Sequence, residues 1–222
     1  PFRSSLTALE LGGVCSVADH IVDPATVGKG TGDWSGLASL PLLPALSELE
    51  LSCQPLGEAG AVALASIPAL PRLWYLGLHY ANLGDAGAVA LAASRSFTGL
   101  KEVVLSHNRM TAKGFAALAG WRGLATVERL YLGSNYPGAE GMAALAQAKH
   151  LGQLRDLRVW WNDFPFPAWF GSAWFGPSGA AALAQAKGMK RLESLNLMGQ
   201  RIGSEGAEAL AASKAFPALK EL

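Results

Sequence analysis

A leucine-rich phrase recurs every 27 residues along the chain, and this period constrains the fold more than any other feature. The clearest copy spans residues 73–91, in which the stretch LWYLGL is followed by Gly84, Gly87 and Leu91. The same residue types return at the same phases in four further segments: 46–64, 100–118, 127–145 and 192–210. A fixed period with the same chemistry at each phase is the signature of a solenoid.

Each repeat predicts a strand, a turn and a short helix. In residues 127–133 (VERLYLG) the apolar side chains alternate with a period of two, which is typical of a strand. A pair of glycines permits the turn, and the alanine-rich run that follows favours a helix. Alternating strands and helices predict a parallel sheet with right-handed crossovers, so the expected fold class is an α/β solenoid.

The leucine spacing and the phrases GAVALA (60–65 and 87–92) and GAAALA (179–184) resemble known repeats. They resemble the leucine-rich-repeat family, its ribonuclease-inhibitor-like class, and the GALA-type repeats of bacterial effector proteins. The resemblance covers essentially the whole chain. It implies a horseshoe that has a parallel concave β-sheet and short convex helices and that binds proteins on the concave sheet.

The period predicts one leucine-rich-repeat array over residues 1–222, with repeats of about 27 residues. Leu6 and Leu9 already belong to a repeat and Leu219 opens another, and no polar end cap is visible, so we expect an array truncated at both ends. The period is broken by extra residues near 17–32 and 165–175, at the same phase. Insertions at one phase of a solenoid are expected on one rim, often the binding rim.

Asparagines at 108, 135 and 162 come just after their strands. At that position an amide side chain can satisfy the backbone groups of neighbouring turns, which predicts an asparagine ladder through the array. Gln54, Ala81 and Gln200 stand at the same phase in other repeats, and there we expect less regular turns.

Composition excludes several classes of protein. The 18 basic and 17 acidic residues nearly cancel, so no strong electrostatic attraction to nucleic acid or to an anionic membrane is expected. The longest uncharged stretch, 164–186, contains three prolines and three glycines and does not suit a membrane-spanning helix. Two cysteines are too few for a disulfide framework, which favours a reducing, intracellular and cytoplasmic setting.

Side chains between the repeat leucines are expected to point away from the core and to form the concave surface. Tryptophan, tyrosine and arginine are enriched in binding hot spots, and they gather at these positions. The predicted partner-binding residues are Trp74, Tyr75, His79, Tyr80, Glu102, His107, Arg129, Tyr131, Arg158, Trp160, Trp161, Trp169, Phe170, Trp174 and Phe175. The alternative is sheet decoration, in which Arg158 lies on Tyr131 while Glu102, Arg129 and Asp156 form a charge ladder.

The aromatic insertion PFPAWFGSAWF, at 165–175, has two equally weighted interpretations. It is a wedge that touches a partner or a membrane, or it folds back and caps the rim against Trp160 and Trp161. Sparse basic residues on its flanks make membrane contact the weaker version of the wedge.

No catalytic residue, metal site or cofactor is predicted. None of the histidines, at 20, 79, 107 and 150, has metal-ligand spacing to another, although His79 and His107 are expected to approach across adjacent strands. Cys15 and Cys53 lie in neighbouring repeats but lack an activating base, and there is no phosphate-binding loop motif.

The expected function is a protein–protein interaction module that is part of a larger protein or assembly. The expected partners are proteins, with no nucleic acid and no membrane span. The first alternative is a regulator of an enzyme, of the nuclease-inhibitor or GTPase-activating type, as the resemblance implies. The others are the recognition arm of an effector or ubiquitin ligase and a purely architectural role.

Overall fold

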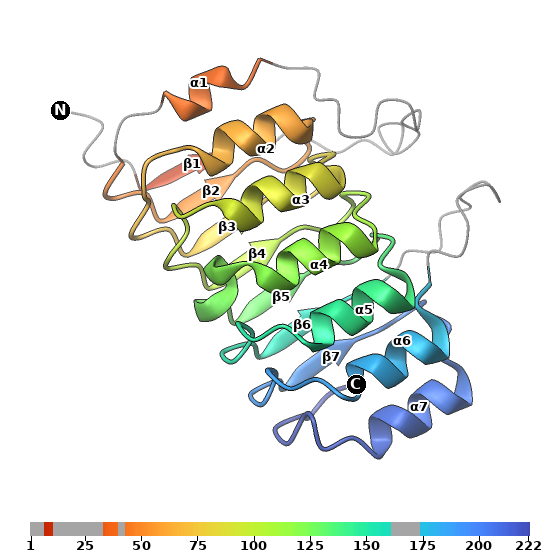
Figure 1. Cartoon of the computed structure of the whole chain (residues 1–222). Coiled ribbons are helices and arrows are strands. Elements are labelled where there is room, and N and C mark those ends of the chain that lie inside the picture. Colours follow the sequence, from red (N-terminus) through yellow and green to blue (C-terminus); the bar gives the residue numbers. More distant parts are fainter. Residues whose placement is uncertain (1–6, 11–32, 40–42, 161–173) are drawn as a thin grey trace.

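The computed structural model describes residues 7–10, 33–39, 43–160 and 174–222. In this part of the chain one parallel sheet holds the strands in sequence order, β1 to β7 (Figure 1). The strands are β1 (Ala8–Glu10), β2 (Glu48–Glu50), β3 (Tyr75–Gly77), β4 (Glu102–Val104), β5 (Arg129–Tyr131), β6 (Asp156–Arg158) and β7 (Ser194–Asn196). The predicted α/β leucine-rich-repeat solenoid is therefore confirmed.

The helices form one layer against one face of this sheet and follow each other in sequence order (Figure 1). They are α1 (Ser35–Ala38), α2 (Gly57–Ala65), α3 (Gly84–Ala93), α4 (Ala112–Gly120), the 3₁₀ helix η4 (Arg122–Thr126), α5 (Gly138–Ala146), α6 (Gly176–Leu183) and α7 (Gly203–Ala211). Consecutive helices pack side by side, as consecutive strands do. Each repeat therefore contacts its neighbours in both layers.

The register of the sheet follows the sequence period. Leu49, Leu76 and Val103 are paired neighbours on β2, β3 and β4, and each is fully buried between the sheet and the helices. The same phase continues through Leu130 to Leu157. Because neighbouring strands keep one register, the same core position of every repeat joins a continuous apolar column.

The two glycines of a repeat are required for different structural reasons. Gly84 begins α3 with a φ of +60°, a left-handed conformation that favours glycine. Gly87 lies one turn later, where an added Cβ would come within 2.8 Å of the Leu83 Cβ. In α4 the first position is taken by Thr111, which has a φ of −94° and accepts a hydrogen bond from the Lys113 N–H instead. The helix start therefore has two solutions, one based on glycine and one on a side-chain cap.

The predicted asparagine ladder is confirmed at Asn108 and Asn135. The Asn135 Oδ1 accepts hydrogen bonds from the N–H groups of Asn108 (3.2 Å) and Met110 (3.0 Å). Its Nδ2 donates to the carbonyls of Leu105 and Leu132, both at 3.0 Å. Asn108 makes the same kind of bonds one repeat earlier, so the side-chain amide of each asparagine joins two consecutive repeats.

The ladder changes where Ala81 takes the place of asparagine, because alanine has no side-chain oxygen to accept bonds from the turn of the preceding repeat, at Gln54. There the Gln54 N–H donates to the Leu51 carbonyl at 3.4 Å, and the Leu56 N–H donates to the Gln54 carbonyl at 2.7 Å. These bonds stay inside one turn, so the backbone itself replaces the missing amide. Asn162 lies outside the described residues.

The expected insertions fall mostly outside the described residues. This applies to the whole of 17–32 and to 165–173, whereas Trp174 and Phe175 are described. Among the described helices none is long and apolar enough to cross a membrane.

Replacing Asn135 by alanine tests the ladder. The variant leaves buried N–H and carbonyl groups without partners, so we expect the free energy of unfolding to fall by about 3 kcal/mol. Urea denaturation measures this change. Asn196→Ala is the matched control, because the half-buried Asn196 accepts one bond from the Met198 N–H, and we expect a loss below about 1 kcal/mol. Equal losses in the two variants would contradict the ladder.

Candidate functional site

The strands present one row of side chains to the helices and the alternate residues to the opposite side of the sheet. We call this second side the open sheet face; no described helix lies on it (Figure 1). Its described residues on the strands are Ala8, Glu10, Glu48, Glu50, Tyr75, Gly77, Glu102, Val104, Arg129, Tyr131, Asp156, Arg158, Ser194 and Asn196. The sheet register places Tyr75 beside Glu102, and Tyr131 beside Arg158.

Charged and aromatic side chains contact each other across the middle of this face. The Arg129 Nε lies 2.6 Å from the Glu102 Oε2, and this hydrogen bond raises the pKa of Arg129. The Arg158 guanidinium lies over the Tyr131 ring at 5.0 Å and also pairs with Asp156 at 2.9 Å. The contacts expected of a decorated sheet are thus present. They nevertheless leave 46% of the Arg158 side chain exposed, so Arg158 remains accessible to a partner.

A second row of charges runs along the residues just before the strands. Lys101 pairs with Glu128 at 3.0 Å, and this contact is the main reason why the pKa of Glu128 is lowered. Glu193 pairs with Arg155 on one side and with Lys220, at 2.6 Å, on the other. In this row the residue before β3 is Trp74 instead of a charged residue, and Trp74 is 37% exposed.

Four rings meet where β3, β4 and β6 end, and we call His79, Tyr80, His107 and Trp160 the rim cluster. The rings of Tyr80 and His107 stack with centroids 4.0 Å apart. His79 meets His107 edge to face at 4.9 Å, as expected from adjacent strands, and Trp160 reaches His107 at 5.8 Å. Trp160 passes over Gly133, where an added Cβ would lie 2.8 Å from the indole ring.

The backbone of the rim cluster is strained. Tyr80 has a φ of +54° and His107 a φ of +58°, a region that bulky residues rarely adopt. Cys53, Ser134 and Gly199 stand at the same repeat position with φ values of +62°, +53° and +76°. The turn therefore requires a left-handed residue, and the chain places aromatic rings where glycine would avoid the strain.

Sequence reasoning missed two half-buried residues beside the rim cluster: Tyr136, which interacts with Tyr80, and Arg109, which interacts with Tyr136. Burial lowers the pKa of Arg109, and burial raises the pKa of Tyr136, which interacts electrostatically with both Arg109 and Tyr80. Burial, and secondarily Tyr136, raises the pKa of Tyr80 to about 12. Arg201 occupies the same repeat position as Arg109, and both have a positive φ.

The structure corrects one predicted contact residue. Phe175 is only 3% exposed and belongs to the core. It precedes Gly176 and lies over Gly179, just as Leu83 precedes Gly84 and lies over Gly87. Phe175 is therefore the core residue of its repeat, displaced along the sequence by the insertion.

Of the other predicted contact residues in and beside the insertion, one is described by the structure and three are not. Trp174 is half-buried and lies under the Arg201 guanidinium at 3.6 Å from the ring centroid. Trp161, Trp169 and Phe170 lie outside the described residues.

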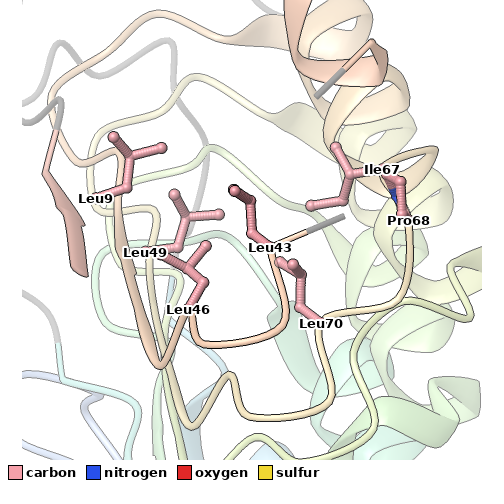
Figure 2. Close-up of a pocket in the computed structure, with 7 residues that line it drawn as sticks. All are labelled: Leu9, Leu43, Leu46, Leu49, Ile67, Pro68 and Leu70. Carbon is pink, nitrogen blue, oxygen red and sulfur yellow. The ribbon is translucent and has the colours of Figure 1, made fainter. Parts of the chain in front are cut away.

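The small apolar pocket in Figure 2 lies between β1, β2 and the end of α2. Leucine, isoleucine and proline side chains line it: Leu9, Leu43, Leu46, Leu49, Ile67, Pro68 and Leu70. Its volume of about 10 Å³ leaves no room for an organic ligand. In the described segments no group of three or more His, Cys, Asp or Glu residues could hold a metal ion.

Cys53 is disulfide-bonded. The chain has two cysteines, and the other, Cys15, lies outside the described residues. Disulfides persist mainly in oxidising compartments, so this bond disagrees with the reducing setting expected from the low cysteine count.

Comparison with known proteins agrees with the repeat architecture. Residues 190–211 match a family model described as Leucine Rich repeat. No curated protein sequence matches the chain. The sheet has the fold of an α/β leucine-rich-repeat solenoid, and the repeat at 190–211 matches the Leucine Rich repeat model.

Solved structures similar to the chain include an internalin (inlF) from Listeria monocytogenes str. 4b F2365. The sequence identity is 17% and the TM-score is 0.35. The alignment covers 84% of this chain, which spans 63% of that internalin chain. Similarity at this level carries no conclusion about function.

The tyrosines provide a test of this geometry by pH. Burial is the largest cause that raises the pKa of Tyr75, Tyr80, Tyr131 and Tyr136 above the ordinary value of 10.0. As pH rises above 10, the unfolded chain ionises first, so the stability contributed by these groups is lost with increasing pH. An ultraviolet titration of phenolate should therefore give native midpoints above 10 and denatured midpoints near 10. Native midpoints at 10, in protein that circular dichroism shows to be folded, would contradict the burial.

Proposed function

We propose that this chain is a non-enzymatic protein-interaction module that binds its partner on the open sheet face. The observation that carries the proposal is the half-buried Tyr131 and the exposed Arg158 on this face, together with the exposed Trp74 just before β3. These residue types dominate binding hot spots. Because the face belongs to a sheet and not to loops, its side chains keep fixed spacing from strand to strand.

The contacts on this face favour binding energetically. Tyr131 holds Arg158 by a cation–π contact, and Asp156 holds it by an ion pair. Such contacts limit the side-chain motion that a partner would otherwise have to arrest, and this ordering is a cost of association. The side-chain contacts across the sheet are therefore compatible with a binding role.

The rim cluster extends the proposed site to one edge of the sheet. Its four rings lie against each other where β3, β4 and β6 end, and aromatic side chains are enriched in binding hot spots. Trp161 follows Trp160 in the sequence and the insertion begins at residue 165, so we propose Trp161, Trp169 and Phe170 as further partner contacts. We also propose that residues 1–222 are one array within a larger protein or assembly.

A ribonuclease-inhibitor-like or GALA-type identity remains our proposal for the repeat subtype, supported by the glycine–alanine phrases of α2, α3 and α6. An enzyme regulator would change the rate of an added nuclease or GTPase. The recognition arm of a ubiquitin ligase would bring an F-box segment in the same gene. A purely architectural role predicts that substitutions on the open sheet face leave every partner bound.

The double substitution Trp74→Ala/Arg158→Ala tests the open sheet face. Both side chains are accessible, so the variant should fold while losing two anchors. After affinity capture from the native source, calorimetry with the purified partner should show binding at least about tenfold weaker. The control Val62→Ser/Val89→Ser changes exposed residues of α2 and α3 and should bind like wild type. Unchanged affinity in the Trp74/Arg158 variant, with weaker binding in the control, would move the site to the helical side.

The compartment is tested by the state of Cys53. The disulfide predicts that maleimide labels protein from the native source only after reduction, whereas the expected cytoplasmic setting predicts labelling without reductant. Mass spectrometry of the intact protein distinguishes the two results. We expect no label before reduction. Full labelling of both cysteines in unreduced protein would restore the cytoplasmic assignment.

A further inference from the structure

Charges on the open sheet face are paired except at its N-terminal end. Glu102 pairs with Arg129, and Asp156 pairs with Arg158. Glu10, Glu48 and Glu50 have no cation within ion-pair distance in the described part of the chain. The strands β1 to β3 carry no lysine or arginine, so this end of the face is uniformly acidic.

The register of the sheet makes this arrangement costly. Glu10 and Glu50 are paired neighbours on β1 and β2, and like charges directly opposite each other destabilise a sheet. From β4 to β6 the first residues of the strands, Glu102, Arg129 and Asp156, lie side by side with alternating sign. The chain therefore uses the stabilising pattern in one half of the face and the destabilising pattern in the other.

Glu50 is held in place at this acidic end. Its Oε2 accepts a hydrogen bond from the Tyr75 hydroxyl at 2.6 Å, and its Oε1 accepts one from the Ser52 N–H at 2.7 Å. Gly77 makes room for it, since an added Cβ would lie 2.4 Å from both carboxylate oxygens. The carboxylate is therefore fixed flat against the sheet, and burial together with the Glu50 bond raises the pKa of Tyr75.

Trp74 supplies an exposed aromatic surface beside these carboxylates. It directly precedes β3, and its ring lies 5.8 Å from the Tyr75 ring at a tilt of 58°. Its exposed fraction of 37% leaves ring surface available, and tryptophan is the best aromatic partner for a cation. A fixed carboxylate and an exposed indole together suit lysine or arginine side chains.

We propose that the β1–β3 end of the open sheet face binds a segment rich in lysine or arginine in a protein partner. Such a segment supplies the cations that Glu10, Glu48 and Glu50 lack, and it relieves the repulsion between Glu10 and Glu50. A metal ion is the poorer occupant, because no described group of acidic residues has a metal-binding arrangement. This inference rests on the proposed function and adds the chemistry of the partner.

The test compares two double variants that lose the same charge. Glu10→Gln/Glu48→Gln removes exposed carboxylates of the acidic end, and Glu58→Gln/Glu140→Gln removes exposed carboxylates from α2 and α5. The probe is a short fluorescent peptide of alternating arginine and serine, with a glutamate–serine peptide as the charge control. Fluorescence anisotropy at low salt should show arginine-peptide binding about fivefold weaker in the first variant and unchanged in the second. Added salt should weaken the wild-type interaction.

A stability measurement separates binding from structure. Because Glu10 repels Glu50, Glu10→Gln/Glu48→Gln should raise the urea midpoint while weakening peptide binding. Equal peptide affinity in both variants, or equal binding of the glutamate peptide, would overturn the inference. If a captured partner depends on Trp74 and Arg158 but binds the Glu10/Glu48 variant normally, the proposed function stands and this inference fails.

Discussion

The structure depends on one constraint, which is that every repeat must meet its neighbours in the same register. A single three-residue strand such as β3 cannot bury Leu76 on its own, but in register Leu76 lies between Leu49 and Val103. From β2 to β6 the apolar column, the asparagine ladder and the packed helices all repeat with the same 27-residue step. Stability in such an array comes from nearest-neighbour interfaces, so the repeat phase cannot drift without loss of core, ladder and sheet together.

The same constraint shows which parts of the fold the sequence could predict. Strands, helix starts and the ladder at Asn108 and Asn135 follow from residue types that recur at fixed phases. Phe175 was misassigned because its repeat contains an insertion, which separates the core residue from its strand. Counting from the glycines that follow Phe175, instead of from the leucines that precede it, would have placed it in the core. The repeat position of a residue next to an insertion can be counted from the repeat residues before or after the insertion, and only the count that does not cross the insertion is reliable.

The candidate site was predicted less completely, for a different physical reason. Alternation along a strand tells which side chains share a face, and it correctly placed Tyr131 beside Arg158. It does not tell how far a long side chain leans, so the contact between Trp160 and His107 over Gly133 could not be anticipated. Nor does periodicity identify half-buried residues of the turns such as Arg109, whose importance comes from burial.

The contrast between the two halves of the open sheet face has a physical cause in how solenoids gain stability. Interfaces between repeats tolerate small local losses, because the buried leucine columns contribute far more than one surface charge pair. A repulsive pair such as Glu10 and Glu50 can therefore persist in the sheet without unfolding it. The unfavourable energy of that pair is available to a partner that brings cations, since relieving it adds to the free energy of binding. Where all charges on a surface are already paired, a charged partner relieves no repulsion. The acidic end is therefore better suited to electrostatic recognition than the β4–β6 half of the same sheet, in which the charges form ion pairs.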